Sequence, residues 1–122
     1  AAPHLEGAAS RVRIGTGPAA QSYLDIERIV AAARETGCDA VHPGYGFLSE
    51  NSRFAAAVAA AGVTFVGPKP ETIDALGDKA RAKALMEAAR VPVVPGGGDA
   101  SDDPETVEAM VRRIGFPVLL KP

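Results

Sequence analysis

The sequence predicts an α/β fold in which short parallel strands are joined by crossover helices. Apolar segments of strand length alternate with segments whose apolar residues recur at helical spacing, in the order strand, helix, strand, helix, strand. These segments are separated by Gly and Pro, which interrupt regular structure. The chain has 122 residues, of which 47% are hydrophobic, so it has the length of one ordinary domain and can form a core.

The first predicted strand covers residues 11–14 ("RVRI"), where polar and apolar residues alternate. The first helix follows Asp25, a residue type that caps helices, and Gly37 is its stop signal. Its apolar residues Ile26, Ile29 and Val30 lie on one face.

Residues 39–42 ("DAVH") form the second predicted strand. An alanine-rich helix then begins at Ser49 or Asn51 and stops at Gly62. Residues 63–68 ("VTFVGP") form the third strand, so the strands should be parallel and the helices should connect them.

The pattern changes after residue 68. Pro70 suits a first helical turn, and the short helix that it begins should end near Gly77. Asp78 is predicted to cap the next helix, and Asp103 a further one that ends at Gly115. We therefore place a domain boundary between residues 1–77 and 78–122. Residues 91–101 read as extended and then loose, and residues 116–122 as a strand that ends the chain; we expect the chain to be incomplete at both ends.

Composition excludes several classes of function. The 13 basic and 15 acidic residues leave a net charge of −2, which offers no basic footprint for nucleic acid or an anionic membrane. No apolar run reaches the length of a membrane span, and the first ten residues do not resemble a signal peptide. A single cysteine, Cys38, cannot form an internal disulfide, and these features favour the reducing cytoplasm.

The loop "HPGYGFLSEN" (residues 42–51) follows a strand, and loops at the carboxyl ends of strands bind ligands in α/β proteins. Gly44 and Gly46 permit a close approach of the main chain to a ligand, and Tyr45 offers a flat face and a hydroxyl. Glu50 lies near a helix start, where the dipole favours a carboxylate. The same residues also fit a rigid turn with Ser49 as helix cap, and local chemistry leaves both interpretations open.

Other polar residues indicate little chemistry. His42 lies next to proline at a strand end, where a buried hydrogen-bonding role is commoner than catalysis. Cys38 follows a helix end and reads as small buried filler. No His or Cys residues have the spacing of a structural zinc site. The segment "PGGG" (residues 95–98) is followed by acidic residues, so we interpret it as a connector and not as a phosphate loop.

Two lysines are candidates for binding an anion. Lys79 is predicted to lie in the first turn of a helix, where a cation opposes the helix dipole. Lys121 ends the last predicted strand, and a single compact charge there suits a phosphate. The alternatives are a solvated lysine beside Asp78 and an edge lysine that discourages aggregation.

Several stretches together resemble the biotin carboxylase family. They are "HPGYGFLSEN", residues 65–96 ("FVGPKPETIDALGDKARAKALMEAARVPVVPG") and residues 113–122 ("RIGFPVLLKP"), with "APH", "VRIG" and "SYLDIERIVAAA" upstream. The resemblance covers nearly the whole chain in the family's order. It implies a Rossmann-like preATP-grasp domain with a parallel sheet, incomplete here, in residues 1–77, followed by the start of an ATP-grasp domain in residues 78–122.

The resemblance also implies an activity. Biotin carboxylases use MgATP and bicarbonate to carboxylate biotin held on a carrier protein or domain, within acetyl-CoA, propionyl-CoA, methylcrotonyl-CoA or pyruvate carboxylases. Implied partners are that carrier, a carboxyltransferase and, for a full-length chain, a second copy in a homodimer. The alternatives are another ATP-grasp ligase, such as a carbamoyl-phosphate synthetase, and a non-catalytic domain that binds a partner.

By position, Lys79 and Lys121 resemble the family's two ATP-binding lysines, and Tyr45, Gly46 and Glu50, with His42, match the loop that faces its active site. The chain departs from the family at both ends. It lacks the opening strand with its "ANRGEIA"-like turn and the Gly-rich ATP loop that follows "LLK". It also lacks the magnesium-binding carboxylates and the catalytic base, so we expect no catalytic residue in this stretch and no turnover by it alone.

Overall fold

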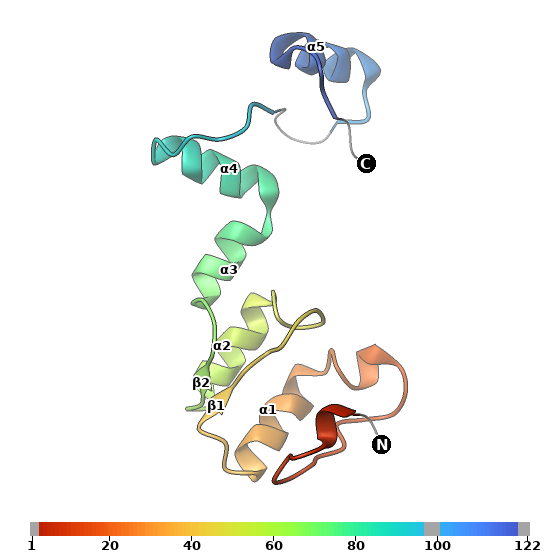
Figure 1. Cartoon of the computed structure of the whole chain (residues 1–122), viewed down its shortest axis with the longest axis vertical. Coiled ribbons are helices and arrows are strands. Elements are labelled where there is room, and N and C mark those ends of the chain that lie inside the picture. Colours follow the sequence, from red (N-terminus) through yellow and green to blue (C-terminus); the bar gives the residue numbers. More distant parts are fainter. Residues whose placement is uncertain (1–2, 97–100, 120–122) are drawn as a thin grey trace. The chain divides into compact units, whose positions relative to one another are not determined.

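The computed structural model describes residues 3–96 and 101–119 (Figure 1). The chain divides into two compact units, Ala1–Gly77 and Asp78–Pro122. The elements of the first unit are two 3-10 turns, η1 (Pro3–Leu5) and η2 (Ala19–Gln21), the helices α1 (Ile26–Glu35), α2 (Ser52–Ala60) and α3 (Pro70–Gly77), and the strands β1 (Ala40–Val41) and β2 (Thr64–Phe65).

The two strands of the first unit pair in parallel, with Ala40 opposite Thr64 and Val41 opposite Phe65. Helix α2 connects them, as a parallel pair requires, because a two-residue turn cannot return the chain to the same end of the sheet. The predicted α/β fold with a parallel sheet is therefore confirmed, with one crossover helix between two strands that are each only two residues long.

The core of the first unit gathers around one face of α2. Phe54 and Val58 are 2% and 1% exposed, and they cluster with Leu48 and Val63. The face of α1 predicted from its apolar spacing packs against this cluster, together with both strands. Leu48, from the loop after β1, is thus tied to the same core as the crossover helix.

Four helices begin at the cap residues that the sequence predicted. The side chains of Asp25, Asn51, Asp78 and Asp103 each accept a hydrogen bond from the backbone N–H three residues later. Asn51, and not Ser49, caps α2. These bonds satisfy an N–H that the helix itself cannot pair.

Three helices end in the same Schellman turn, in which the residue after the C-cap is left-handed. At the end of α1 that residue is Gly37, with φ 67°, and at the end of α2 it is Gly62, with φ 74°. At the end of α4 (Lys79–Ala88) it is Arg90, with φ 59°. The bonds from Arg90 N–H to the Glu87 carbonyl and from Val91 N–H to the Met86 carbonyl are both 2.9 Å long.

Because Arg90 carries a Cβ in this conformation, we expect Arg90→Gly to stabilise the end of α4. Relief of the left-handed strain stabilises the folded state by about 1–2 kcal/mol. The greater freedom of glycine in the unfolded chain offsets about 0.5–1 kcal/mol of this gain. The expected gain is therefore up to about 1.5 kcal/mol, measured as slower amide hydrogen exchange in α4. Ala84→Gly, within the same helix, should destabilise α4 and make its amide hydrogen exchange faster. Slower exchange in Ala84→Gly would contradict the explanation given for Arg90.

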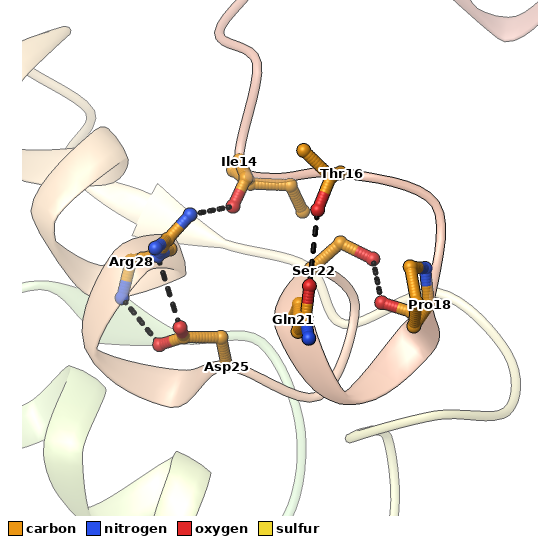
Figure 2. Close-up of polar contacts among 7 residues, drawn as sticks. All are labelled: Ile14, Thr16, Pro18, Gln21, Ser22, Asp25 and Arg28. Atoms are coloured by element: carbon orange, nitrogen blue, oxygen red, sulfur yellow. Dashed lines mark hydrogen bonds and ion pairs between the residues drawn. The ribbon is translucent and has the colours of Figure 1, made fainter.

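The predicted strand over residues 11–14 is wrong, since this segment has no regular structure. The Ile14 carbonyl accepts a hydrogen bond of 3.4 Å from the Arg28 side chain, in place of a strand neighbour (Figure 2). Arg28 also pairs with the Asp25 carboxylate at 3.1 Å. A side chain at the start of α1 thus holds this segment. The alternation of polar and apolar residues could not show that, within the described residues, no strand pairs with it.

In the second unit, α4 is followed by residues without regular structure up to residue 96, and α5 spans Pro104–Ile114. Both predicted helices are confirmed. The Thr106 hydroxyl and N–H donate to Asp103, which lowers the pKa of that carboxyl. Residues 116–119 are not a strand, and the rest of the predicted strand lies outside the described residues. Within the described part of the chain, no helix is long and apolar enough to cross a membrane.

Candidate active site

The loop after β1 contains three residues with a positive φ. Gly44 and Gly46 have φ values of 68° and 76°, which residues with a Cβ rarely adopt, and Phe47 follows with φ 47°. The Gly44 N–H donates to Nδ1 of His42 at 3.0 Å. The two glycines predicted to permit an unusual backbone therefore do so.

The far side of the loop is attached to the core of the first unit. Leu48 is 6% exposed. The Ser49 N–H donates to the Gly46 carbonyl at 2.9 Å, and the Asn51 N–H donates to the Leu48 carbonyl at 3.1 Å. Asn51 then caps α2. The stretch from residue 46 to residue 51 is thus a rigid turn, as one of the two interpretations of the sequence expected, and its role in binding a ligand stays a prediction.

The predicted site residues of this loop lie at the surface. Tyr45 is fully exposed at 100%, so its ring and hydroxyl are free to meet a ligand. His42 and Glu50 are also exposed. The prediction that His42 forms a hydrogen bond is confirmed, since its ring accepts from the Gly44 N–H, but the prediction that it is buried is wrong. The loop can offer a ligand an aromatic face, a hydroxyl, a carboxylate and main-chain groups.

An aromatic contact of this loop was missed by the sequence analysis. The rings of Phe47 and Tyr23 stack with centroids 4.7 Å apart and an angle of 21° between their planes. Both residues stand in stretches that resemble the family, but no local pattern links positions so far apart in the chain.

The two lysines belong to the second unit. Lys79 is the first residue of α4 and is exposed, next to the Asp78 cap, so its predicted place in the first helical turn is confirmed. Lys121 lies outside the described residues. The structure gathers His42, Tyr45, Gly46 and Glu50 on one loop.

Two further residue types bear on chemistry. Cys38 is exposed, so its predicted role as buried filler is wrong; its thiol lies 3.3 Å from the Thr36 hydroxyl beyond the end of α1. Among residues 3–96 and 101–119, no group of three or more His, Cys, Asp or Glu side chains could hold a metal ion.

Two family descriptions match the chain in succession. Residues 1–73 match the N-terminal domain of biotin carboxylase. Residues 78–122 match the ATP-binding domain of the carbamoyl-phosphate synthase L chain.

Individual proteins agree with the first match. The chain is 51% identical over 119 residues to a biotin carboxylase of Pseudomonas aeruginosa, covering 97% of this chain and 26% of that protein. It is 49% identical to the mitochondrial methylcrotonoyl-CoA carboxylase subunit alpha of Oryza sativa subsp. japonica, covering 98% of this chain and 16% of that subunit. The chain thus spans about a quarter or less of these relatives.

Solved structures give the same result. The biotin carboxylase domain of a thermophilic 2-oxoglutarate carboxylase, bound to bicarbonate, superimposes with a TM-score of 0.80 at 46% identity, covering 97% of this chain and 26% of that one. A Campylobacter jejuni biotin carboxylase in a β,γ-ATP complex superimposes with a TM-score of 0.82 at 39% identity, covering 93% of this chain and 26% of that one. Together with the loop "HPGYGFLSEN" on a parallel α/β unit, these matches show that the chain belongs to the biotin carboxylase family.

Proposed function

We propose that the protein is a biotin carboxylase, which uses ATP and bicarbonate to carboxylate biotin carried on a partner protein or domain. It would act within an acyl-CoA or pyruvate carboxylase. The observation that carries this proposal is the loop of residues 42–51. It leaves β1 at its carboxyl end, with two left-handed glycines on either side of a fully exposed tyrosine, in a chain of this family.

The loop would act by shaping the site and not by transferring protons. The glycines bring the main chain close to small reactants, and Tyr45 would form one wall beside the phosphate and biotin. Gly46 and Glu50 would line the same wall, with His42 holding its first turn through Gly44. No described residue is assigned as a catalytic base.

Lys79 and Lys121 would bind the nucleotide. Two lysines that neutralise phosphate charge contribute by positioning and by electrostatic stabilisation. Lys79 begins α4, where a cation costs about 0.3–1 kcal/mol against the helix dipole. A binding role would explain why the helix begins with a residue that does not stabilise it.

The proposal includes the domain limits and partners. Residues 1–77 would belong to the preATP-grasp domain and residues 78–122 to the beginning of the ATP-grasp domain. The protein would work in the cytoplasm as a homodimer, with a biotin carrier and a carboxyltransferase. ATP would act with Mg²⁺, which supplies charge neutralisation at the phosphates; we place none of its ligands on the described residues.

ATP hydrolysis with bicarbonate, measured on the natural polypeptide with and without free biotin, tests the proposal. We expect biotin to stimulate hydrolysis. We expect Lys79→Gln or Lys121→Gln to raise the KM for ATP about tenfold or more, the loss typical of a hydrogen bond to a charged group. Lys69→Gln removes an exposed lysine outside the proposed site and is the matched control.

The outcomes distinguish the candidate functions. An active ATPase that ignores biotin would indicate another ATP-grasp ligase, which the match of residues 78–122 also allows. A natural polypeptide that neither hydrolyses nor binds ATP would leave a partner-binding domain as the function. If Lys79→Gln and Lys121→Gln have the same KM for ATP as the control Lys69→Gln, neither Lys79 nor Lys121 belongs to the nucleotide site.

A further inference from the structure

Phe47 holds a left-handed backbone conformation although it is a bulky residue with a Cβ. Its φ is 47°. Among the described residues, Arg90 is the other non-glycine with a positive φ, and there the conformation completes a helix end. Phe47 completes no helix, since α2 begins only at Ser52. Strained backbone of this kind persists only where its surroundings stabilise it.

Burial in the core does not account for this conformation. Phe47 is 62% exposed, whereas the next residue, Leu48, is 6% exposed and belongs to the core. The ring of Phe47 stacks on that of Tyr23, with centroids 4.7 Å apart and planes inclined by 21°. Parallel aromatic stacking at this distance is favourable beyond the area that it buries.

Tyr23 lies between two residues that are held by hydrogen bonds; Figure 2 shows the bond of the first of them, Ser22, to Pro18. Ser22, immediately before it, is 6% exposed, and its hydroxyl donates to the Pro18 carbonyl at 3.0 Å. The Leu24 N–H, immediately after it, donates to the Ala19 carbonyl at 2.8 Å. Both neighbours of Tyr23 are therefore held by hydrogen bonds, so its main chain is fixed, while its ring is half exposed and stacks on Phe47.

The stretch between His42 and Leu48 needs such a support. Gly44 and Gly46 are the most permissive residues of the loop, and Tyr45 between them is fully exposed. The ring of Phe47 holds this stretch from its far end, as the bond from Gly44 N–H to His42 holds it from the near end. The bond from the Ser49 N–H to the Gly46 carbonyl also spans Phe47. Without the stack, that bond alone would hold the left-handed conformation of Phe47, and the main chain of Gly46 and Tyr45 would open more often.

We propose that Tyr23 is a positioning residue for the reaction: its stack on Phe47 fixes the stretch that presents Tyr45 and Gly46. This inference rests on the proposed function only for its kinetic consequence. Its structural consequence can be measured without any substrate.

The test compares Tyr23→Ala with Tyr23→Phe, which keeps the ring. Hydrogen exchange of peptides that cover residues 43–50 should be about three- to tenfold faster in Tyr23→Ala, the range that corresponds to one aromatic pair. Exchange in α2 should stay unchanged. The kcat/KM for free biotin should fall by a similar factor with the KM for ATP unchanged, and Tyr23→Phe should remain near the parent in every measurement.

Unchanged exchange of residues 43–50 in Tyr23→Ala would overturn the inference. Faster exchange of residues 43–50 with unchanged kinetics would mean that the stack fixes the loop but that the loop does not belong to the active site. That result overturns the role of Tyr23 in the reaction. Faster exchange in α2 of Tyr23→Ala would point to general destabilisation. In that case Tyr23→Ala is combined with Phe47→Gly, to decide whether its effect on the loop passes through the stack. If Tyr23→Ala still accelerates loop exchange when Phe47 has already been replaced, the effect does not pass through the stack and the inference fails.

Discussion

Phe54→Ala should lower the free energy of unfolding of the first unit by about 3–5 kcal/mol, the usual cost of truncating a buried phenylalanine. Phe54 is 2% exposed and packs edge-on against Phe65, with ring centroids 5.9 Å apart and planes at 89°. It joins α2 to β2 and to the core cluster. Because an ordinary domain is stable by about 5–15 kcal/mol, this single change would remove much of the total.

Hydrogen exchange of the α2 amides measures this loss in the natural polypeptide, where a single unfolding transition is not assured. Arg53→Ala alters the neighbouring exposed residue of the same helix and should change the stability by no more than about 0.5 kcal/mol. Equal exchange in the two variants would mean that Phe54 does not carry the core.

Gly15→Ala should destabilise the start of the first unit by about 1–3 kcal/mol, the cost of forcing a methyl group into occupied space. A Cβ at Gly15 would lie 1.8 Å from the Gln21 carbonyl oxygen and 3.1 Å from Cα of Ser22. Both are backbone atoms and cannot rotate away. The main chain around η2 would have to shift, and with it the bond from the Ser22 hydroxyl to Pro18.

Gly17 supplies the matched control for this substitution. A Cβ there would meet nothing within 4 Å, and its φ lies outside the left-handed region. Gly17→Ala should therefore leave stability unchanged or raise it by up to about 1 kcal/mol, by restricting the unfolded chain. Stability is measured by hydrogen exchange of α1 and its preceding turn. If Gly15→Ala and Gly17→Ala lose similar stability, the contact at Gly15 is not the cause of the loss.

Much of the fold follows from local chemistry, and that part was predictable. A carboxylate or amide at a helix start meets its N–H partner within the same turn, so Asp25, Asp78 and Asp103 could be recognised from sequence. Glycine after the last helical residue marked the ends of α1 and α2 for the same reason. The end of α4 gave no such sign, because Arg90 occupies the left-handed position.

Features that depend on distant parts of the chain were not predictable. Residues 11–14 have the alternation of a strand, but a strand needs a neighbour, and Arg28 takes up the Ile14 carbonyl instead. The loop of residues 42–51 could be singled out by its glycines, yet its support by Tyr23 could not. The roles of Lys79 and Lys121 stay predictions from family resemblance.

The core cluster of Leu48, Phe54, Val58 and Val63 has a consequence for the order of folding. Its members lie within residues 48–63, so bringing them together closes only a short loop and costs little chain entropy. Contacts of such short sequence separation form quickly, and pulsed hydrogen exchange during refolding should find α2 protected among the first elements. The loop that carries Tyr45 leads directly into this segment, so it would be shaped early, before more distant partners have arrived to complete the site.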